Sequence, residues 1–176
     1  MRLWLLSLSV LGSLLLAAPA SAYEVVGRPW PGPRITYFID ARDQAEQVQA
    51  GAQEWNALDL GVRFSRTTSR SKAQVRIRYG SRGCGGAALV GYPGRRYQSE
   101  VRLGRGCKDS LTFLTIVHEL GHVLGLGHER SRCALMNTSA DYATGTPNRC
   151  APRPLSFWLA KPLRKDDVAG ARKLYG

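Results

Sequence analysis

The sequence predicts an α+β domain, and three observations support this fold class. Residues 34–40 (RITYFID) are dense in β-branched and aromatic side chains, and residues 73–79 (AQVRIRY) alternate apolar and polar positions, as strands with one solvated face do. Residues 110–124 carry leucine and valine at helical spacing. Residues 166–175 indicate a last helix, because the two aspartates at its start suit the positive end of a helix dipole.

Shorter elements are expected between these segments. Residues 44–58 place valine, alanine and tryptophan on one side of a helix. Short strands are expected at 62–64, 87–90 and 100–103. The proline-rich stretch 137–162 is expected to be irregular. Asp109 or Ser110 is the candidate cap of the helix over 110–124.

Residues 1–22 have the pattern of a signal peptide. Arg2 supplies a positive start, residues 3–18 form an apolar run, and Ala20-Ser21-Ala22 fits the cleavage rule of small residues. A membrane anchor is the alternative, but the run is short for a span and the cleavage site follows it directly. We therefore expect residues 23–176 to form one secreted domain, extracellular or periplasmic, with no membrane span.

All four cysteines lie in this expected mature part. An even number of cysteines in an exported chain favours two disulfides, and the spacings contain no CxxC pair of the kind that favours a cysteine zinc site. Four cysteines allow three pairings. We favour Cys84–Cys107 and Cys133–Cys150, which join the nearest neighbours in sequence.

The chain is strongly basic, with a formal net charge of +12. Such a surface favours acidic partners, so a weak association with an anionic polymer is open. The sequence has no nucleic-acid motif and no basic tract interleaved with aromatic residues, so a specific nucleic-acid partner is not expected. An arginine-rich soluble surface without a dedicated partner is the simpler interpretation.

The stretch 118–128 (HELGHVLGLGH) carries the chemistry. His118 and His122 are four residues apart and share one face of a helix, where two imidazoles can bind one metal ion. Gly125 allows the chain to leave the helix, and His128 then arrives as a third ligand. The chain has three histidines, and all three belong to this motif. Three imidazoles and an open fourth position indicate a catalytic zinc site, in which Glu119 acts on a water.

These residues resemble the metzincins, and within that group the matrixins. The quoted motif is followed by Ala134-Leu135-Met136, and the family places this methionine in a tight turn below the zinc, where it is not a ligand. The ending LRKDDVAGARKLYG is similar to the last matrixin helix, and the segments around 34–40 and Trp55 are similar to the start of the domain. The resemblance implies a twisted five-stranded mixed sheet with an antiparallel edge strand, three helices and a zinc cleft.

The sequence also departs from these families. Residues 67–107 hold one acid, Glu100, against nine arginines and lysines, and no histidine. Because hard cations need several oxygen ligands, the structural zinc and calcium sites of matrixins are not expected here. About ten residues separate the expected cleavage point from the first strand, so no cysteine-switch propeptide is expected. Asn137 and Thr138 follow Met136, so the tyrosine ligand of astacins is absent two residues after that methionine.

We therefore expect a zinc metalloendopeptidase with one catalytic zinc on His118, His122 and His128 and no other cofactor. Glu119 would act as general base and then as general acid. A peptide or protein substrate would lie along an edge strand near 87–91, and residues after Met136 would form a wall of the pocket. Two alternatives stay open: a secreted basic zinc-binding protein without peptidase activity, and a zinc peptidase directed at peptidoglycan. We expect a monomer.

Overall fold

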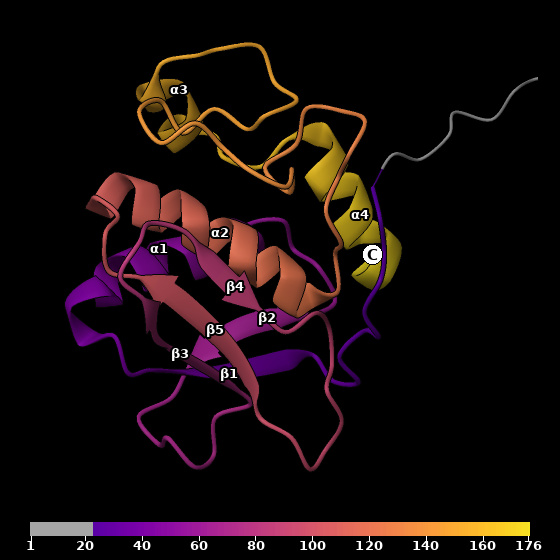
Figure 1. Ribbon diagram of the computed structural model, residues 1–176. Helices are drawn as coiled ribbons and strands as arrows, with labels where there is room; N and C mark the ends of the chain where they lie inside the picture. The colour runs from indigo at the N-terminus through magenta and orange to yellow at the C-terminus, as the bar shows by residue number, and fades with distance from the viewer. Residues whose placement is uncertain (1–22) are drawn as a thin grey trace, which may run out of the picture.

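A computed structural model describes residues 23–176, and the expected signal peptide 1–22 lies outside the described residues. Its centre is a five-stranded mixed sheet in the order β2-β1-β3-β5-β4 (Figure 1). The strands are β1 (Arg34–Ile39), β2 (Arg63–Arg66), β3 (Val75–Ser81), β4 (Gly86–Ala88) and β5 (Ser99–Gly104). Four strands run parallel, and β4 pairs with β5 in the antiparallel direction at one edge. The expected mixed sheet with an antiparallel edge strand is confirmed.

Side-chain alternation decides which face of the sheet is covered. Ile35, Tyr37 and Ile39 of β1 are buried, whereas Arg34 is exposed and Thr36 is half-buried. β3 and β5 repeat this pattern, with Arg76, Arg78, Glu100 and Arg102 on the other face. Because successive side chains of a strand point to opposite faces, one face of the sheet belongs to the core and the other faces solvent.

Two long helices, α1 (Ala45–Asn56) and α2 (Asp109–Leu124), cover the apolar face (Figure 1). They pack closely, because Gly51 of α1 has no side chain where Ile116 of α2 approaches. Trp55 Nε1 donates a hydrogen bond of 2.8 Å to the carbonyl oxygen of Val117. A short 3-10 turn, Arg42–Gln44, leads into α1.

Helix α2 is buried along most of its length, with ten of its sixteen residues in the interior. A helix that is apolar nearly all round belongs inside a fold, where neighbours cover every side. Its first residue is Asp109, and its N-cap, Lys108, makes no side-chain capping bond. The expectation that Asp109 or Ser110 caps the helix is wrong, because both residues already lie within its first turn.

The C-terminal part begins across α2 from the sheet and ends in a helix that lies beside the C-terminal end of α2 (Figure 1). It consists of the irregular segment 137–154, helix α3 (Leu155–Ala160) and helix α4 (Lys165–Tyr175). The three helices expected from the sequence are present as α1, α2 and α4, and α3 is a further helix. The prediction of an irregular stretch as far as residue 162 is wrong, since α3 lies within it. This helix has six residues, too few to show a helical period, and it packs through Trp158, whose Nε1 donates to Thr146 Oγ1.

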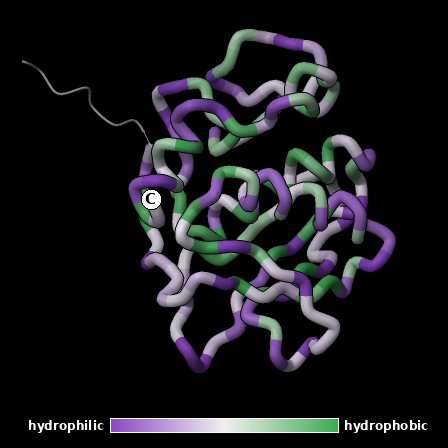
Figure 2. Tube along the Cα trace, turned by 180° about the vertical axis from the view of Figure 1, so that it is seen from behind, coloured by the Kyte–Doolittle hydropathy of each residue, from purple (hydrophilic) through white to green (hydrophobic). Residues whose placement is uncertain are grey.

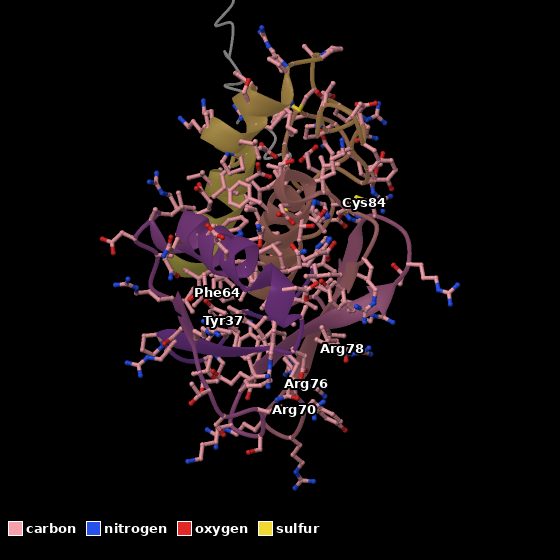
Figure 3. All side chains as sticks on the ribbon, turned by 90° about the vertical axis from the view of Figure 1, so that its left-hand side faces the viewer. Tyr37, Phe64, Arg70, Arg76, Arg78 and Cys84 are labelled. Carbon is pink, nitrogen blue, oxygen red and sulfur yellow. A yellow bond between two sulfur atoms is a disulfide. The ribbon has the colours of Figure 1, made fainter. Side chains whose placement is uncertain are left out.

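The hydrophobic core fills the space between the sheet and the helices. Figure 2 shows hydrophobic stretches through the middle of the molecule and mostly hydrophilic loops at its lower edge. In Figure 3, Tyr37 and Phe64 lie between the strands and α1, and both are almost fully buried. Within the described part of the chain, no helix has the length and apolar character needed to cross a membrane.

The structure confirms both favoured disulfides, Cys84–Cys107 and Cys133–Cys150. The first joins the loop before β4 to the loop before α2. The second joins the segment after His128 to the irregular segment 137–154. Each bridge thus ties a loop beside α2 to a second loop, and neither tie needs a metal ion.

Removing the second disulfide should weaken the fold. In Cys133→Ser/Cys150→Ser we expect the free energy of unfolding to fall by about 3 kcal/mol, because the bridge closes a loop of about eighteen residues in the unfolded chain. Thermal unfolding measures this loss. Limited digestion with trypsin should then cut faster after Arg132 or Arg149. A matched Cys84→Ser/Cys107→Ser variant should lose similar stability without faster cutting there. Equal cutting rates in the two variants would contradict the idea that Cys133–Cys150 holds this segment.

Candidate metal centre and cleft

The centre is built on the second half of α2. His118 and His122 lie one turn apart and project from the same side of the helix, as their spacing predicts. Gly121 between them makes room for the turn below, because a side chain at that position would strike Met136 and Trp55. The helix thus presents two ligands on one face while Met136 supports it from beneath.

Gly125 ends the helix and turns the chain. Its φ of 113° lies in the left-handed region, and its N–H donates to the carbonyl oxygen of His122 at 2.8 Å. The turn is held from outside the motif, because the N–H groups of Val26 and Gly27 both donate to the Gly125 carbonyl oxygen at 3.1 Å. Three residues later His128 reaches the open side of the helix.

The three imidazoles meet at one point. His128 Nε2 lies 3.3 Å from His118 Nε2 and 3.1 Å from His122 Nε2, and the ligand atoms of the group all lie within 4.8 Å of one another. Two nitrogens bound to one zinc ion at tetrahedral geometry lie about 3.3 Å apart, given Zn–N bonds of about 2.0–2.1 Å. The residues therefore fit one zinc ion. Among residues 23–176, these histidines are the group of His, Cys, Asp or Glu side chains that lie close enough together to hold a metal ion.

The other ring nitrogens set the tautomers. His118 Nδ1 lies 2.8 Å from the carbonyl oxygen of Leu135, and His122 Nδ1 lies 2.8 Å from that of Leu126. A carbonyl can only accept, so Nδ1 carries the proton and Nε2 keeps its lone pair for a metal. Burial, followed by the neighbouring His122, lowers the pKa of His118 to about 3. Burial also lowers the pKa of His122, so both rings are neutral ligands at pH 7.

Asp167 of α4 connects the last helix to this centre. Its carboxylate is buried and accepts hydrogen bonds from the N–H groups of Leu135 (2.9 Å) and Met136 (3.0 Å), and from Arg164 N–H (2.8 Å). Burial raises the pKa of this carboxyl, and the three N–H groups oppose that shift. Since the Leu135 carbonyl in turn receives His118 Nδ1–H, Asp167 holds the turn that orients a ligand.

Glu119 lies beside the three histidines with 4% of its surface exposed. Burial raises the pKa of its carboxyl to about 8. Oε2 is buried and accepts no hydrogen bond from the described residues. An unpaired buried oxygen is costly in an ordinary core, so its place here favours a role toward a bound water or cation.

Gly86 at the start of β4 lies directly against Glu119. A methyl group at Gly86 would come within 2.8 Å of Glu119 Cγ and Oε1 and of Thr115 Cγ2. β4 ends at Ala88 and does not reach the expected Val90. Beyond its end, Gly91 N–H donates to the carbonyl oxygen of His122 at 2.8 Å. The edge strand is thus fitted to α2 at both of its ends.

A cleft of about 900 Å³ runs between β4 and the C-terminal part and contains the three histidines and Glu119. Residues 137–142 and Gly145 form one wall, as expected for the segment after Met136. Leu111 and Leu114 of α2 line the depth of the cleft at one end. The N-terminal residues Glu24 and Val26 line the other end.

Several of these residues were not expected from the sequence. Glu24, Gly86 and Asp167 reach the centre from segments far from the motif, and no spacing in the chain indicates such contacts. Leu114 was expected in the core, because its helical spacing gives no sign that it also lines a cavity. The sequence did contain a signal for Asp167, because the segment that contains it resembles the last matrixin helix.

Comparisons with known proteins agree with this geometry. A model of the Astacin peptidase family matches residues 23–137, which is 115 of the 176 residues. A model of the family Matrixin matches residues 105–176. The expected metzincin resemblance is confirmed, and within the metzincins the longer match is to astacins, although the sequence more closely suggested matrixins.

Related sequences include proteins that are named as metalloproteases. Astacin-like metalloprotease toxin 1 of Loxosceles intermedia is 38% identical over 104 residues, which cover 58% of this chain and 37% of the toxin. Tolloid-like protein 1 of Mus musculus is 32% identical over 117 residues, 65% of this chain and 11% of that protein. Metalloendoproteinase 1 of Glycine max is 29% identical over 169 residues, 81% of this chain and 50% of its own length. The chain thus spans half or less of each of these relatives.

Two solved structures share the fold. High choriolytic enzyme 1, a hatching enzyme zinc-protease from Oryzias latipes, matches with a TM-score of 0.54 at 18% identity, over 85% of this chain and 94% of that one. Myroilysin matches with a TM-score of 0.53 at 16% identity, over 84% and 82% of the two chains. With a family model that matches well over half of its length, this chain belongs to the astacin family of the metzincin zinc metallopeptidases.

Proposed function

We propose that this protein is an exported zinc metalloendopeptidase in which His118, His122 and His128 bind one zinc ion and Glu119 transfers protons. The observation that supports this proposal most is the unpaired Oε2 of Glu119, buried beside three imidazole nitrogens that point at one place. A structural zinc site has no need for a free carboxylate at that position.

Bound zinc would supply a Lewis acid that polarises the scissile carbonyl and lowers the pKa of a water at the open position. Glu119 would take the proton of the attacking water and later donate it to the leaving amine. Its pKa of about 8 shows how strongly the site disfavours a lone negative charge, and a cation on the histidines would lower that pKa again.

The substrate would pair with the free edge of β4. A peptide in the antiparallel direction, the more stable pairing, would run from the Val90 and His122 end of the cleft toward Thr115. Residues before the cleaved bond would then lie near Val90, and residues after it near Leu111 and Leu114. These leucines favour an apolar side chain directly after the cleaved bond.

Export is part of the proposal. Residues 1–22 have the pattern of a cleaved signal peptide, and both disulfides fit an oxidising compartment. Residues 23–176 would form one catalytic domain that acts as a monomer.

Two other functions are distinguishable from this one. A basic zinc-binding protein without peptidase activity would bind zinc and cleave nothing. A peptidase directed at peptidoglycan would use the same centre, and a comparison of purified cell walls with casein as substrates separates it from a general endopeptidase.

Variants at two positions of the motif test the assigned roles. Glu119→Ala should keep one zinc per chain and lose roughly 10²–10⁴-fold of peptide hydrolysis, since the ligands are intact and the proton transfer is lost. His128→Ala should instead lose zinc, because a ligand is missing. Metal analysis and hydrolysis of a peptide library measure both effects. Full zinc occupancy in His128→Ala, or retained hydrolysis in Glu119→Ala, would contradict the assignment.

Gly86 provides a second test of the centre. In Gly86→Ala, the added methyl would press on Glu119 and Thr115, so we expect kcat/KM to fall roughly 10- to 10²-fold while zinc stays bound. Gly83→Ala is the matched control, because a methyl there meets nothing within 4 Å. Wild-type kinetics in Gly86→Ala would show that the contact between β4 and Glu119 does not position the carboxylate.

We also propose a weak association with anionic polymers through the solvent face of the sheet. Figure 3 shows Arg70, Arg76 and Arg78 together on the side of the sheet away from α1. Asp40 lies 3.3 Å from Arg70 and 2.8 Å from Arg76, so one carboxylate is shared by two guanidinium groups. Glu100 is likewise shared, at 2.6 Å from Arg78 and 3.6 Å from Arg102. The face therefore keeps a net positive charge.

Heparin serves as a polyanion probe of this face. Arg34 and Arg63 are exposed and lie opposite each other on β1 and β2. Arg34→Gln/Arg63→Gln should elute from heparin at clearly lower salt than the wild type, because local charge density governs such binding. Arg149→Gln/Arg172→Gln removes the same charge elsewhere and should shift elution less. Equal shifts in the two variants would mean that net charge alone acts.

A further inference from the structure

The charged side chains that line the cleft differ in whether other residues already bind them. Glu119 is buried beside the histidines. Asp141 accepts hydrogen bonds from the N–H groups of Ala143 and Thr144 and from the Thr144 hydroxyl, so its carboxylate is used within its own loop. Arg102 faces Glu100 at 3.6 Å. Two charged side chains on the lining, Glu24 and Arg130, make no hydrogen bond or ion pair with the residues that the structure describes.

Hydrogen bonds fix the backbone on both sides of Arg130. This residue follows Glu129, which is buried, and Glu129 Oε1 accepts hydrogen bonds from Ser131 Oγ at 2.7 Å and Arg132 N–H at 2.9 Å. The Glu129 carbonyl oxygen accepts a bond of 2.9 Å from Asn137 Nδ2. The backbone is therefore fixed while the exposed Arg130 side chain stays free to meet a ligand.

Arg130 belongs to the end of the cleft that would hold the residues before the cleaved bond. Gly127, one residue before His128, packs against the side chains of Glu24 and Val26. That N-terminal segment in turn packs against Gly91, just after Val90, through Gly27. Arg130 follows His128 by two residues, and both line the same cleft. Arg130 is thus near the third histidine and far along the cleft from Leu111 and Leu114.

We propose that Arg130 selects substrates that carry an aspartate or glutamate on the amino-terminal side of the cleaved bond. This inference rests on the proposed peptidase function. A guanidinium group can take a carboxylate with two parallel hydrogen bonds, which gives both charge and shape recognition. Glu24 lies at the same end and repels acids, so the preference is expected only at the one substrate position that Arg130 reaches.

The first experiment measures cleavage. A set of peptides with the same cleaved bond carries aspartate or asparagine in turn at each of the three positions before it. At one position the wild type should cleave the aspartate peptide about 10-fold better in kcat/KM, a factor in keeping with a hydrogen bond to a charged group. Arg130→Gln should bring that ratio to about one, and Arg130→Glu should favour a lysine peptide. Arg172→Gln, which removes an exposed arginine of α4, should keep the wild-type ratio.

The second experiment separates this inference from the function on which it rests. Zinc-loaded Glu119→Ala protein binds the same labelled peptides without cleaving them, and fluorescence anisotropy gives Kd for each. Tighter binding of the aspartate peptide that disappears when Arg130→Gln is added supports the inference, whether or not the wild type cleaves these peptides. Equal binding of aspartate and asparagine peptides at all three positions would overturn it. Absent cleavage by a zinc-loaded wild type would overturn the proposed function instead.

Discussion

The meeting of three imidazole nitrogens at one point is the constraint on which the rest of this structure depends. The Nε2 atoms of His118, His122 and His128 lie close enough to share one tetrahedral ion. Three neutral imidazole rings whose lone pairs converge do not stabilise one another. The surrounding fold must therefore hold them in place. Buried α2, the left-handed turn at Gly125 and the carbonyl oxygens at both Nδ1 atoms supply that support.

The C-terminal helix takes part in the same support. Asp167 fixes the N–H groups of Leu135 and Met136, and the Leu135 carbonyl then orients His118. A residue on α4 therefore acts on a ligand through a single turn of backbone. Such outer partners of a metal ligand set its tautomer and its orientation. The hydrogen bonds that Asp167 accepts offset the cost of removing its carboxylate from water.

The cleft is assembled from parts of the chain that lie far apart in the sequence. Gly86 of the edge strand β4 lies against Glu119, and Gly91, beyond the end of this strand, is bonded to His122. β4 is the last strand of the sheet and pairs with β5 on one side. The opposite wall is the segment after Met136, tied back by Cys133–Cys150. A disulfide thus ties each of these two walls to a neighbouring loop.

The sequence by itself determined the candidate metal centre, since the spacing of His118, Glu119, His122, Gly125 and His128 follows from the local geometry of one helix and one turn. It also determined the class of fold, because the strands and long helices show their own periods, and it pointed to the cysteine pairs. Only the tertiary structure decided that Gly86 touches Glu119, that Asp167 supports the Met136 turn, that α3 forms around Trp158, and that Arg130 faces the cleft. These are contacts between segments far apart in the chain, and such contacts leave no period or spacing in a single sequence.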